Sequence, residues 1–373
     1  MKIKDITAYL EAWAPLAYQE SYDNAGLIVG DPGVTVTGIL VTLDITEAVV
    51  EEAVRKNCNL IVAHHPIVFR GLKKLNGRNY VERVVIKAIK NDVALYAAHT
   101  NLDNIAGGVS FKIAQKLGLE NVRILAPKSE MLMKLVTFVP TEQEKPEFRG
   151  ASQAVLDALY EAGVGQIGKY DRCSFRTEGT GTFRGNTDSN PTLGEAGQDE
   201  QAHENRIEVI FPAYRQNTVL AALRKAHPYE EVAYYLTTLV NENQEVGSGA
   251  VGDLPEALSE TNFLAYLKNR MDLSVIRHTA LRGQPVRRVA VCGGAGGFLL
   301  NDALAARADV FITADYKYHE FFDADNRIII ADIGHYESEV FTKELIQQYL
   351  LEKMITFAVI LSDIDTNPVQ YYL

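Results

Sequence analysis

The chain has 373 residues, of which 47% are hydrophobic, and a formal net charge of −11. This length exceeds one compact core and suits two or three domains. The acidic balance, with no run of five Lys or Arg residues, argues against nucleic-acid binding, and the apolar runs are too short to span a membrane. The start of the chain lacks signal-peptide features, and we expect Cys58, Cys173 and Cys292 to be buried thiols of a cytoplasmic protein.

The front of the chain predicts alternating strands and helices. A strand at 38–46 leads into a helix-like stretch at 47–57, then a second strand at 59–66 and a third at 92–103. Each strand is a short, almost wholly apolar run that ends in polar or ionisable residues. That pattern is typical of a mostly parallel sheet covered by helices on both faces.

The middle of the chain has a different character. Its predicted elements follow the order β-α-β-β-α-β and are, by residue range, 134–140, 151–163, 171–185, 206–212, 215–227 and 231–239. This order matches an inserted α+β ferredoxin-like domain, which we place at 128–245. A polar stretch at 186–205 is expected to be a surface loop, with ligand contact as the less favoured alternative.

The back of the chain repeats the front. Strands are expected within 288–296, 309–320 and 326–339, and the interval from Arg288 to Val310 equals that from Gly38 to Leu60. The sequence therefore predicts an α/β core of two similar halves, 1–127 and 246–373, packed together around a metal site. The alternative is a coincidence of two βα patterns.

Ionisable side chains gather where these strands end. In open α/β sheets ligands bind outside the carboxyl ends of the strands. Neutral imidazole and carboxylate groups at such ends suit divalent metals. The candidate metal ligands are His64, His65, Asp103, His335 and Glu339.

Each candidate also has a simpler interpretation. A lone histidine is more often a packing residue, Asp103 could cap a turn, and Glu339 could complement a helix N-terminus. A spacing of four nevertheless places His335 and Glu339 on one face of a helical turn. Five ligands exceed the need of one tetrahedral ion and suit two ions that share a bridging water.

Zinc is the expected metal, with iron, manganese, cobalt or nickel as alternatives. His99 and His319 are candidates for orienting ligands or transferring protons, and Lys317 could meet an anionic substrate. The glycine-rich 293–297 resembles a phosphate-binding turn but lacks the residues of a P-loop, so a tight strand-to-helix turn is favoured. His203, His227 and His278 are expected to be structural or surface residues.

The motifs together resemble those of the GTP cyclohydrolase 1 type 2 homologues, dinuclear-metal proteins also described as interacting-factor-like. The resemblance covers nearly the whole chain and rests on ESYDNAGLIVGD, NLIVAHHP, HTNLD, CGGAGG, TADYKYHE and GHYESE. It implies the same five metal ligands and a homohexameric toroid of stacked trimers. The middle block is similar to the inserted domain of longer bacterial members, which resembles signal-transduction and copper-tolerance domains.

These patterns favour a metal-dependent hydrolase that acts on a nucleotide or on a small phosphorylated or heterocyclic substrate through a metal-bridging water. The alternative is a non-catalytic toroid that binds metal or a macromolecule. Nucleic acid threaded through the ring ranks last because of the net charge.

Overall fold

The computed structural model describes residues 1–354 and 356–372. The chain forms two compact units, one made of Met1–Pro127 with Glu245–Leu373 and the other of Lys128–Gln244. Among the described residues, no helix has the length and apolar character needed to cross a membrane.

The first unit contains a five-stranded sheet in the order β1-β4-β3-β2-β15. Its strands are β1 (Gly26–Val29), β4 (Ala94–Ala97), β3 (Leu60–Ala63), β2 (Gly38–Thr42) and β15 (Ala358–Leu361). Only β1 runs antiparallel to its neighbour. The edge strand β15 comes from near the end of the chain, so residues 358–361 complete a sheet whose other strands lie within residues 26–97.

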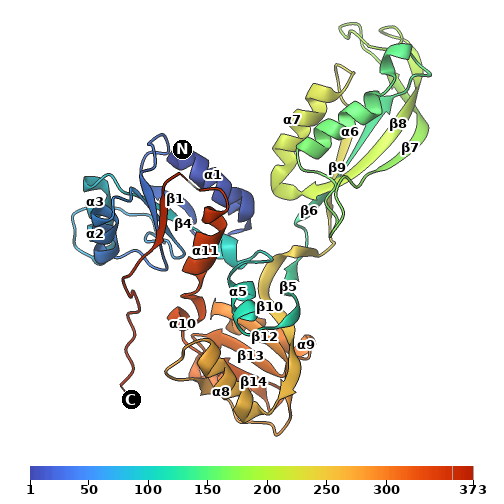
Figure 1. Cartoon of the computed structure of the whole chain (residues 1–373). Coiled ribbons are helices and arrows are strands. Elements are labelled where there is room, and N and C mark those ends of the chain that lie inside the picture. Colours follow the sequence, from blue (N-terminus) through green and yellow to red (C-terminus); the bar gives the residue numbers. More distant parts are fainter. Residues whose placement is uncertain (355, 373) are drawn as a thin grey trace. The chain divides into compact units, whose positions relative to one another are not determined.

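Helices cover this sheet because its central strands are apolar throughout. Helices α2 (Glu47–Arg55) and α3 (Tyr80–Lys90) lie side by side on one face, where Val49, Val50 and Val84 pack against the strands (Figure 1). Thr46 and Asn79 accept hydrogen bonds from the first turns of these helices, which fixes where they begin. Helix α1 (Ile3–Trp13) contacts β1, and α11 (Thr342–Leu351) contacts β2 and β15.

The second sheet of the same unit has six strands in the order β11-β14-β13-β12-β10-β5. They are β11 (Arg277–His278), β14 (Ile329–Asp332), β13 (Val310–Ala314), β12 (Val286–Ala295), β10 (Asn243–Leu258) and β5 (Glu120–Lys128). Strands β12, β13 and β14 are parallel neighbours, as are β2, β3 and β4 in the first sheet.

Apolar side chains cover both faces of this second sheet. One face packs against Ile113 of α5 (Val109–Lys116) and Phe263 of α8 (Glu260–Arg270). The other packs against η4 (Gly297–Leu299), α9 (Leu300–Ala305) and η5 (Tyr318–Ala324). These elements cover the two faces of the sheet and leave the carboxyl ends of the three parallel strands uncovered.

The second unit is one antiparallel sheet with two helices. The strand order is β7-β8-β6-β9, from β7 (Phe175–Arg184), β8 (Asp199–Pro212), β6 (Leu132–Pro140) and β9 (Tyr234–Leu239). Helices α6 (Ala151–Glu161) and α7 (Gln216–Ala226) share its apolar core. Three further short 3-10 helices lie in the two units: η1 (Leu16–Tyr18) in the first, and η2 (Pro146–Phe148) and η3 (Ala213–Arg215) in the second.

Two expectations are wrong in detail. The stretch 186–205 is not a loop to its end, because β8 begins at Asp199 and pairs with β7 from Arg184 onward. An ion pair between Arg184 and Asp199 joins the two strands where this pairing begins. Cys58 and Cys292 are buried as expected, whereas Cys173 is partly exposed because it lies in the segment that precedes β7.

Candidate metal centre

The N-terminal part of the chain contributes three histidines from the ends of neighbouring strands. His64 and His65 follow β3 directly, and His99 follows β4. Because these strands are parallel neighbours, their carboxyl ends bring the rings together, with centroids 4.8 Å apart for His64 and His65 and 5.3 Å apart for His64 and His99. The short helix α4 (Thr100–Asp103) then carries Asp103 toward the same place.

The C-terminal part of the chain contributes a histidine and a glutamate from one helical turn. Gly334 follows β14 with a φ of 91°, and the short helix α10 (His335–Glu339) begins immediately after it. The four-residue spacing brings His335 Nε2 to 3.0 Å from Glu339 Oε2. His65 Nε2 lies 2.9 Å from the same carboxylate oxygen, so side chains from both halves meet at Glu339.

Two overlapping groups of possible ligand atoms result. His64, His65 and His99 form one group, and His65, His335 and Glu339 form the other, with the atoms of each group within 4.8 Å of one another. His65 belongs to both groups. The arrangement therefore offers candidate metal-binding groups whose members come from opposite ends of the chain.

Carboxylates and a carbonyl fix the orientation of the histidine rings. Asp44 Oδ1 lies 2.8 Å from His65 Nδ1, and Asp315 Oδ2 lies 2.7 Å from His335 Nδ1. His64 Nδ1 is 2.7 Å from the carbonyl oxygen of Ala98, which can only accept a hydrogen bond. In each ring the Nδ1 proton is therefore engaged, which leaves Nε2 as the nitrogen that can bind a metal.

Unsatisfied buried atoms show that the residues present suit a metal. Among the described residues, His64 Nε2 and Asp103 Oδ1 are buried and have no hydrogen-bond partner. They are 3.6 Å apart, and His64 Nε2 is 3.8 Å from Glu339 Oε1. These separations are too long for hydrogen bonds but close to the roughly 3–3.5 Å between two ligands with metal bonds of about 2.0–2.2 Å.

The buried carboxylates of the cluster are also stabilised by nearby positive charge. Burial, together with the nearby Glu339, raises the pKa of Asp103 well above its usual value. Burial opposes ionisation of Glu339 too, but hydrogen bonds from His335 and His65 outweigh it and hold its pKa well below the usual range.

The histidines respond to the same carboxylates. Burial lowers the pKa of His64, which stays neutral. Burial also opposes the charge of His65 and His335, but hydrogen bonds to Asp44 and Glu339 raise the pKa of His65 to about 10, and Glu339 and Asp315 raise that of His335 to about 9. In the metal-free protein, two protonated imidazoles therefore supply the charge that bound cations would supply.

Sulfur does not belong to this donor set. Cys292 is buried near the cluster, and burial, together with the charges of Asp103 and Glu339, raises the pKa of its thiol. A metal ligand would have to be the thiolate. The available donors are therefore imidazole nitrogens and carboxylate oxygens.

The glycine-rich segment 293–297 lies against Glu339. Gly294 has a φ of 64°, and a Cβ atom there would lie 2.4 Å from Glu339 Oε1. Its backbone N–H donates to Ser338 Oγ at 2.9 Å. The strand-to-helix turn itself comes at Gly296, between β12 and η4. The glycines thus allow β12 to approach α10 closely.

The remaining candidates lie elsewhere. His319 is exposed on η5 and contacts the ring of Tyr318, so the structure does not bring it into the cluster. Lys317 is exposed and forms an ion pair with Glu320. His227 Nε2 donates to the carbonyl oxygen of Phe138 at 2.8 Å within the second unit, in keeping with a structural role.

Three carboxylates that hold histidine rings of the site, those of Asp44, Asp315 and Asp23, were not among the predicted site residues. Asp44 follows β2 just as His64 follows β3, so its place at a strand end was a signal available in the sequence. Asp23 lies 2.7 Å from His99 Nδ1, and its partner is 76 positions away, so no local pattern could have joined them.

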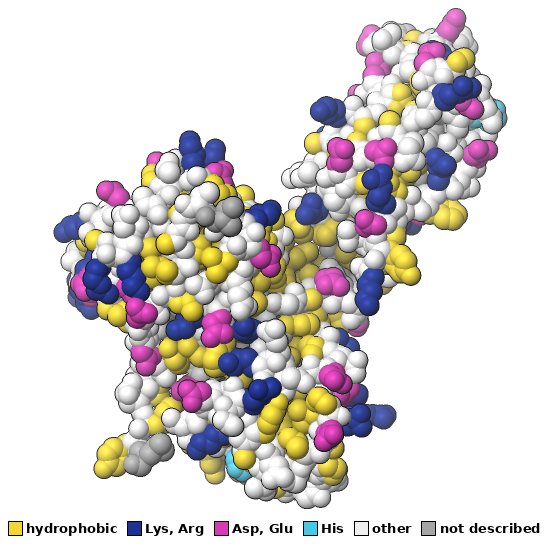
Figure 2. Space-filling model, in the orientation of Figure 1, with side chains coloured by type: hydrophobic (Ala, Val, Ile, Leu, Met, Phe, Trp, Pro, Cys, Tyr) yellow, Lys and Arg dark blue, Asp and Glu magenta, His cyan; other side chains and the backbone are white. Residues whose placement is uncertain are grey.

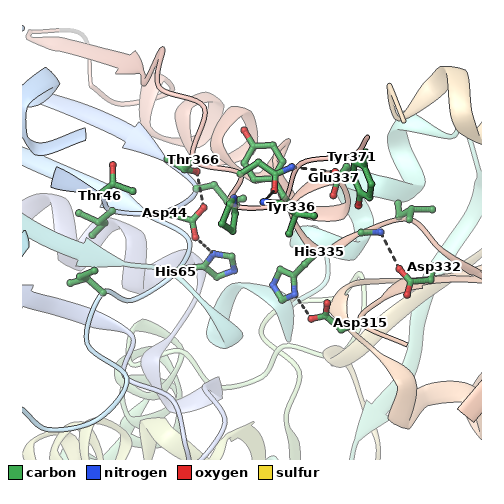
Figure 3. A pocket seen from close by; sticks show the side chains of 18 of the residues that line it. Asp44, Thr46, His65, Asp315, Asp332, His335, Tyr336, Glu337, Thr366 and Tyr371 are labelled. Atoms are coloured by element: carbon green, nitrogen blue, oxygen red, sulfur yellow. Dashed lines mark hydrogen bonds and ion pairs between the residues drawn. The ribbon is translucent and has the colours of Figure 1, made fainter. Parts of the chain in front are cut away.

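A cavity of about 770 Å³ opens beside His65 and His335. Figure 3 shows these two rings turned toward one another, with Asp44 behind one and Asp315 behind the other. The cavity is also lined by the segment 366–371 near the end of the chain. Its size suits a small-molecule ligand.

A family model described as Duf34/NIF3 (NGG1p interacting factor 3) matches residues 1–368. The chain is 38% identical to a "GTP cyclohydrolase 1 type 2 homolog" of Halalkalibacterium halodurans, over 96% of this chain and 95% of that protein. It is 36% identical to a protein of the same description in Bacillus subtilis, over 98% of this chain and 97% of that one.

Solved structures show the same fold. A Bacillus cereus protein related to NIF3 superposes with a TM-score of 0.84 and 36% identity, covering 100% of this chain and 99% of that one. A Staphylococcus aureus protein superposes with a TM-score of 0.78 and 30% identity over the same shares of both chains.

Proposed function

This chain belongs to the Duf34/NIF3 family, and on that basis we propose that it is a dinuclear-metal hydrolase whose ions are held by His64, His65, Asp103, His335 and Glu339. The observation that carries the proposal is a pair of buried atoms without hydrogen-bond partners, His64 Nε2 and Asp103 Oδ1. His64 Nε2 lies 3.6 Å from Asp103 Oδ1 and 3.8 Å from Glu339 Oε1, distances that suit shared ligation.

The donor set supports two ions of zinc, with iron, manganese, cobalt or nickel as alternatives. Nitrogen and oxygen ligands without thiolate suit these metals. Two overlapping groups that share His65 provide more donors than one tetrahedral ion uses. Divalent ions bound there would supply Lewis acidity and lower the pKa of water.

The protein's own residues would orient and protonate the reacting groups. Asp44 and Asp315 hold the rings of His65 and His335 by their Nδ1 atoms, so the Nε2 atoms stay directed at the cluster. Asp23 holds His99 in the same way, which leaves His99 Nε2 as the atom that could take or give a proton. Exposed His319 remains a candidate for proton transfer only as a sequence-based prediction.

The substrate class follows from the names of the relatives and from the cavity. Relatives described as GTP cyclohydrolase 1 type 2 homologues point to a nucleotide or a small phosphorylated or heterocyclic substrate. A cavity of about 770 Å³ beside His65 and His335 is large enough for such a molecule.

Metal content and turnover test the proposal together. Purified protein should retain close to two ions per chain and hydrolyse at least one member of a nucleotide and phosphoester panel. Glu339→Gln should lose metal and turnover, whereas Glu344→Gln, on α11 and paired with Lys112, should keep both. Two retained ions with no turnover would favour a non-catalytic toroidal metal-binding or macromolecule-binding assembly.

We also infer the wider architecture from the resemblance. Residues 1–127 and 246–373 would form two related α/β halves, and 128–245 an inserted ferredoxin-like domain, which the β-α-β-β-α-β order of the second unit supports. A homohexamer of stacked trimers is the proposed assembly, and light scattering on the intact protein tests it.

A cytoplasmic location and no nucleic-acid partner complete the proposal. In the view of Figure 2, Lys and Arg side chains are interspersed with Asp and Glu, and the net charge is −11. A phosphate backbone prefers a continuous basic surface.

A further inference from the structure

We propose that the cavity beside His65 and His335 binds a planar nitrogen heterocycle without negative charge in preference to its polyphosphate derivative. The inference rests on the proposed function, because it names the substrate class of the same site. It comes from the charge, the aromatic rings and the anchoring of the cavity wall.

The charge of the lining opposes a polyphosphate. Four carboxylates line the cavity, from Asp44, Asp315, Asp332 and Glu337. The cationic groups of the lining are the guanidinium of Arg277 and the imidazoles of His65 and His335. Both rings are already held by carboxylates, at Nδ1 by Asp44 or Asp315 and at Nε2 by Glu339. The guanidinium is also engaged, since Nη1 lies 2.8 Å from Asp332 Oδ2 and Nη2 donates to the carbonyl oxygen of Tyr316 at 3.1 Å. Among the described lining residues, no other Lys or Arg is present to receive phosphate oxygens.

Aromatic side chains provide surfaces on which a flat ring can stack. Phe69, Tyr80, Tyr336 and Tyr371 all line the cavity, and the first two are more than half exposed. Aromatic rings stack on heterocycles whatever their substituents, which provides affinity without positive charge. The neighbouring carboxylates can accept hydrogen bonds from ring N–H and amino groups, which a nitrogen heterocycle supplies.

The wall that carries Tyr371 is anchored to both halves of the unit. Thr366 Oγ1 donates to Asp44 Oδ2 at 2.7 Å, and Asn367 Nδ2 donates to Glu337 Oε1 at 3.2 Å. Figure 3 shows Thr366 beside Asp44, and Tyr371 beside Glu337. Residues 366–371 are thus held across the cavity, in a position to contact a ligand.

The inference is tested by comparing the binding of one heterocycle with no phosphate, one phosphate and three phosphates. Guanosine, its monophosphate and its triphosphate are dialysed against the intact, metal-loaded protein, and metal content is measured afterwards because polyphosphates can remove metal. We expect guanosine to bind at least as tightly as the triphosphate. Tighter binding of the triphosphate than of guanosine, or no binding of guanosine or adenosine at about 1 mM, would overturn the inference.

Two neighbouring tyrosines offer a matched pair of variants. Tyr371→Ala should weaken guanosine binding about tenfold, the effect of losing one stacking ring. Tyr372→Ala, at a fully exposed residue outside the lining, should leave it unchanged. Equal effects of both variants would also overturn the inference. Glu337→Gln should improve triphosphate binding more than guanosine binding.

Failure of this inference can be distinguished from failure of the proposed function. A protein that keeps two ions and hydrolyses a substrate but prefers the triphosphate contradicts the inference alone. A protein that binds nucleosides but holds no metal contradicts the proposed function alone.

Discussion

Glu339 accepts a hydrogen bond from His65 at 2.9 Å although 274 positions separate the two residues in the chain. The carboxylate also meets His335 from its own helical turn. One side chain therefore joins the two sheets of the first unit at the candidate metal centre. Substitutions around this contact can show which residues are required for folding and which for metal binding.

Gly294→Ala should remove metal by displacing Glu339. The new Cβ would lie 2.4 Å from Glu339 Oε1, and the φ of 64° adds a backbone cost of about 1–2 kcal/mol. Gly283→Ala is the matched control, because Gly283 has a φ of 75° and open space around it. Both variants should bear this backbone cost in urea, and Gly294→Ala should lose further stability because it displaces Glu339. Only Gly294→Ala should lose metal by elemental analysis. Full metal content in Gly294→Ala would show that the close approach has no role in the site.

Asp44→Asn should weaken metal binding without removing a proposed ligand. Asp44 holds His65 Nδ1 at 2.8 Å and is held in turn by Thr366. Loss of such an orienting carboxylate typically costs about 10–100-fold in metal affinity. Competition with a chelator measures the change. Thr366→Val should give a smaller loss of the same sign, and Asp188→Asn, on the second unit, should give none.

Much of the site could be predicted because its chemistry lies at strand ends. His64, His65 and His335 each follow a buried apolar strand, and the sheet order then brings them together. The signal was weaker for Asp44, which has the same placement but a side chain that is common in turns. A strand end thus indicates which residues can meet, but not which of them bind and which orient.

Contacts between distant segments could not be predicted. Nothing near β15 in the sequence indicates that it pairs with β2, because pairing depends on where the chain returns after α11. The close approach of Gly294 to Glu339 likewise depends on the packing of α10 against β12. Local periodicity predicts elements, whereas such distances arise only from tertiary packing.

Glu52 should make stability depend on pH away from the metal centre. Its fully buried side chain binds Lys56 Nζ at 2.6 Å and the backbone N–H of Asp363 at 2.9 Å, and it also accepts from Ser362. Burial opposes its charge, but the bonds from Lys56 and Ser362 outweigh burial and hold its pKa below the usual 4.5.

The sign of this effect follows from the lowered pKa. The folded state binds the proton less readily than the unfolded state, so the stabilisation is fully present above pH 4.5 and is lost as the pH falls through the folded pKa. The free energy of unfolding of Glu52→Gln should therefore be about 1–3 kcal/mol lower than that of the parent at pH 7, and this difference should shrink below pH 4.5. Urea titrations at several pH values measure it, and a constant difference would contradict the role of the charge.

Asp103→Asn should not destabilise the metal-free protein, but it should make the protein less stable than the parent when metal is added. Without metal, the buried Oδ1 of Asp103 has no hydrogen-bond partner among the described residues, and its charge opposes that of Glu339. The amide removes that conflict, so the metal-free variant should be as stable as the parent or up to about 1 kcal/mol more stable. Added zinc at a hundred times its Kd should stabilise the parent by about 2.7 kcal/mol and the variant much less. Thermal unfolding with and without zinc measures both differences.

The opposite result would be a variant that loses stability without metal and gains as much from zinc as the parent. Asp103 would then be required for the fold and not for metal binding. The ligands would have to be sought among the remaining candidates, His64, His65, His99, His335 and Glu339.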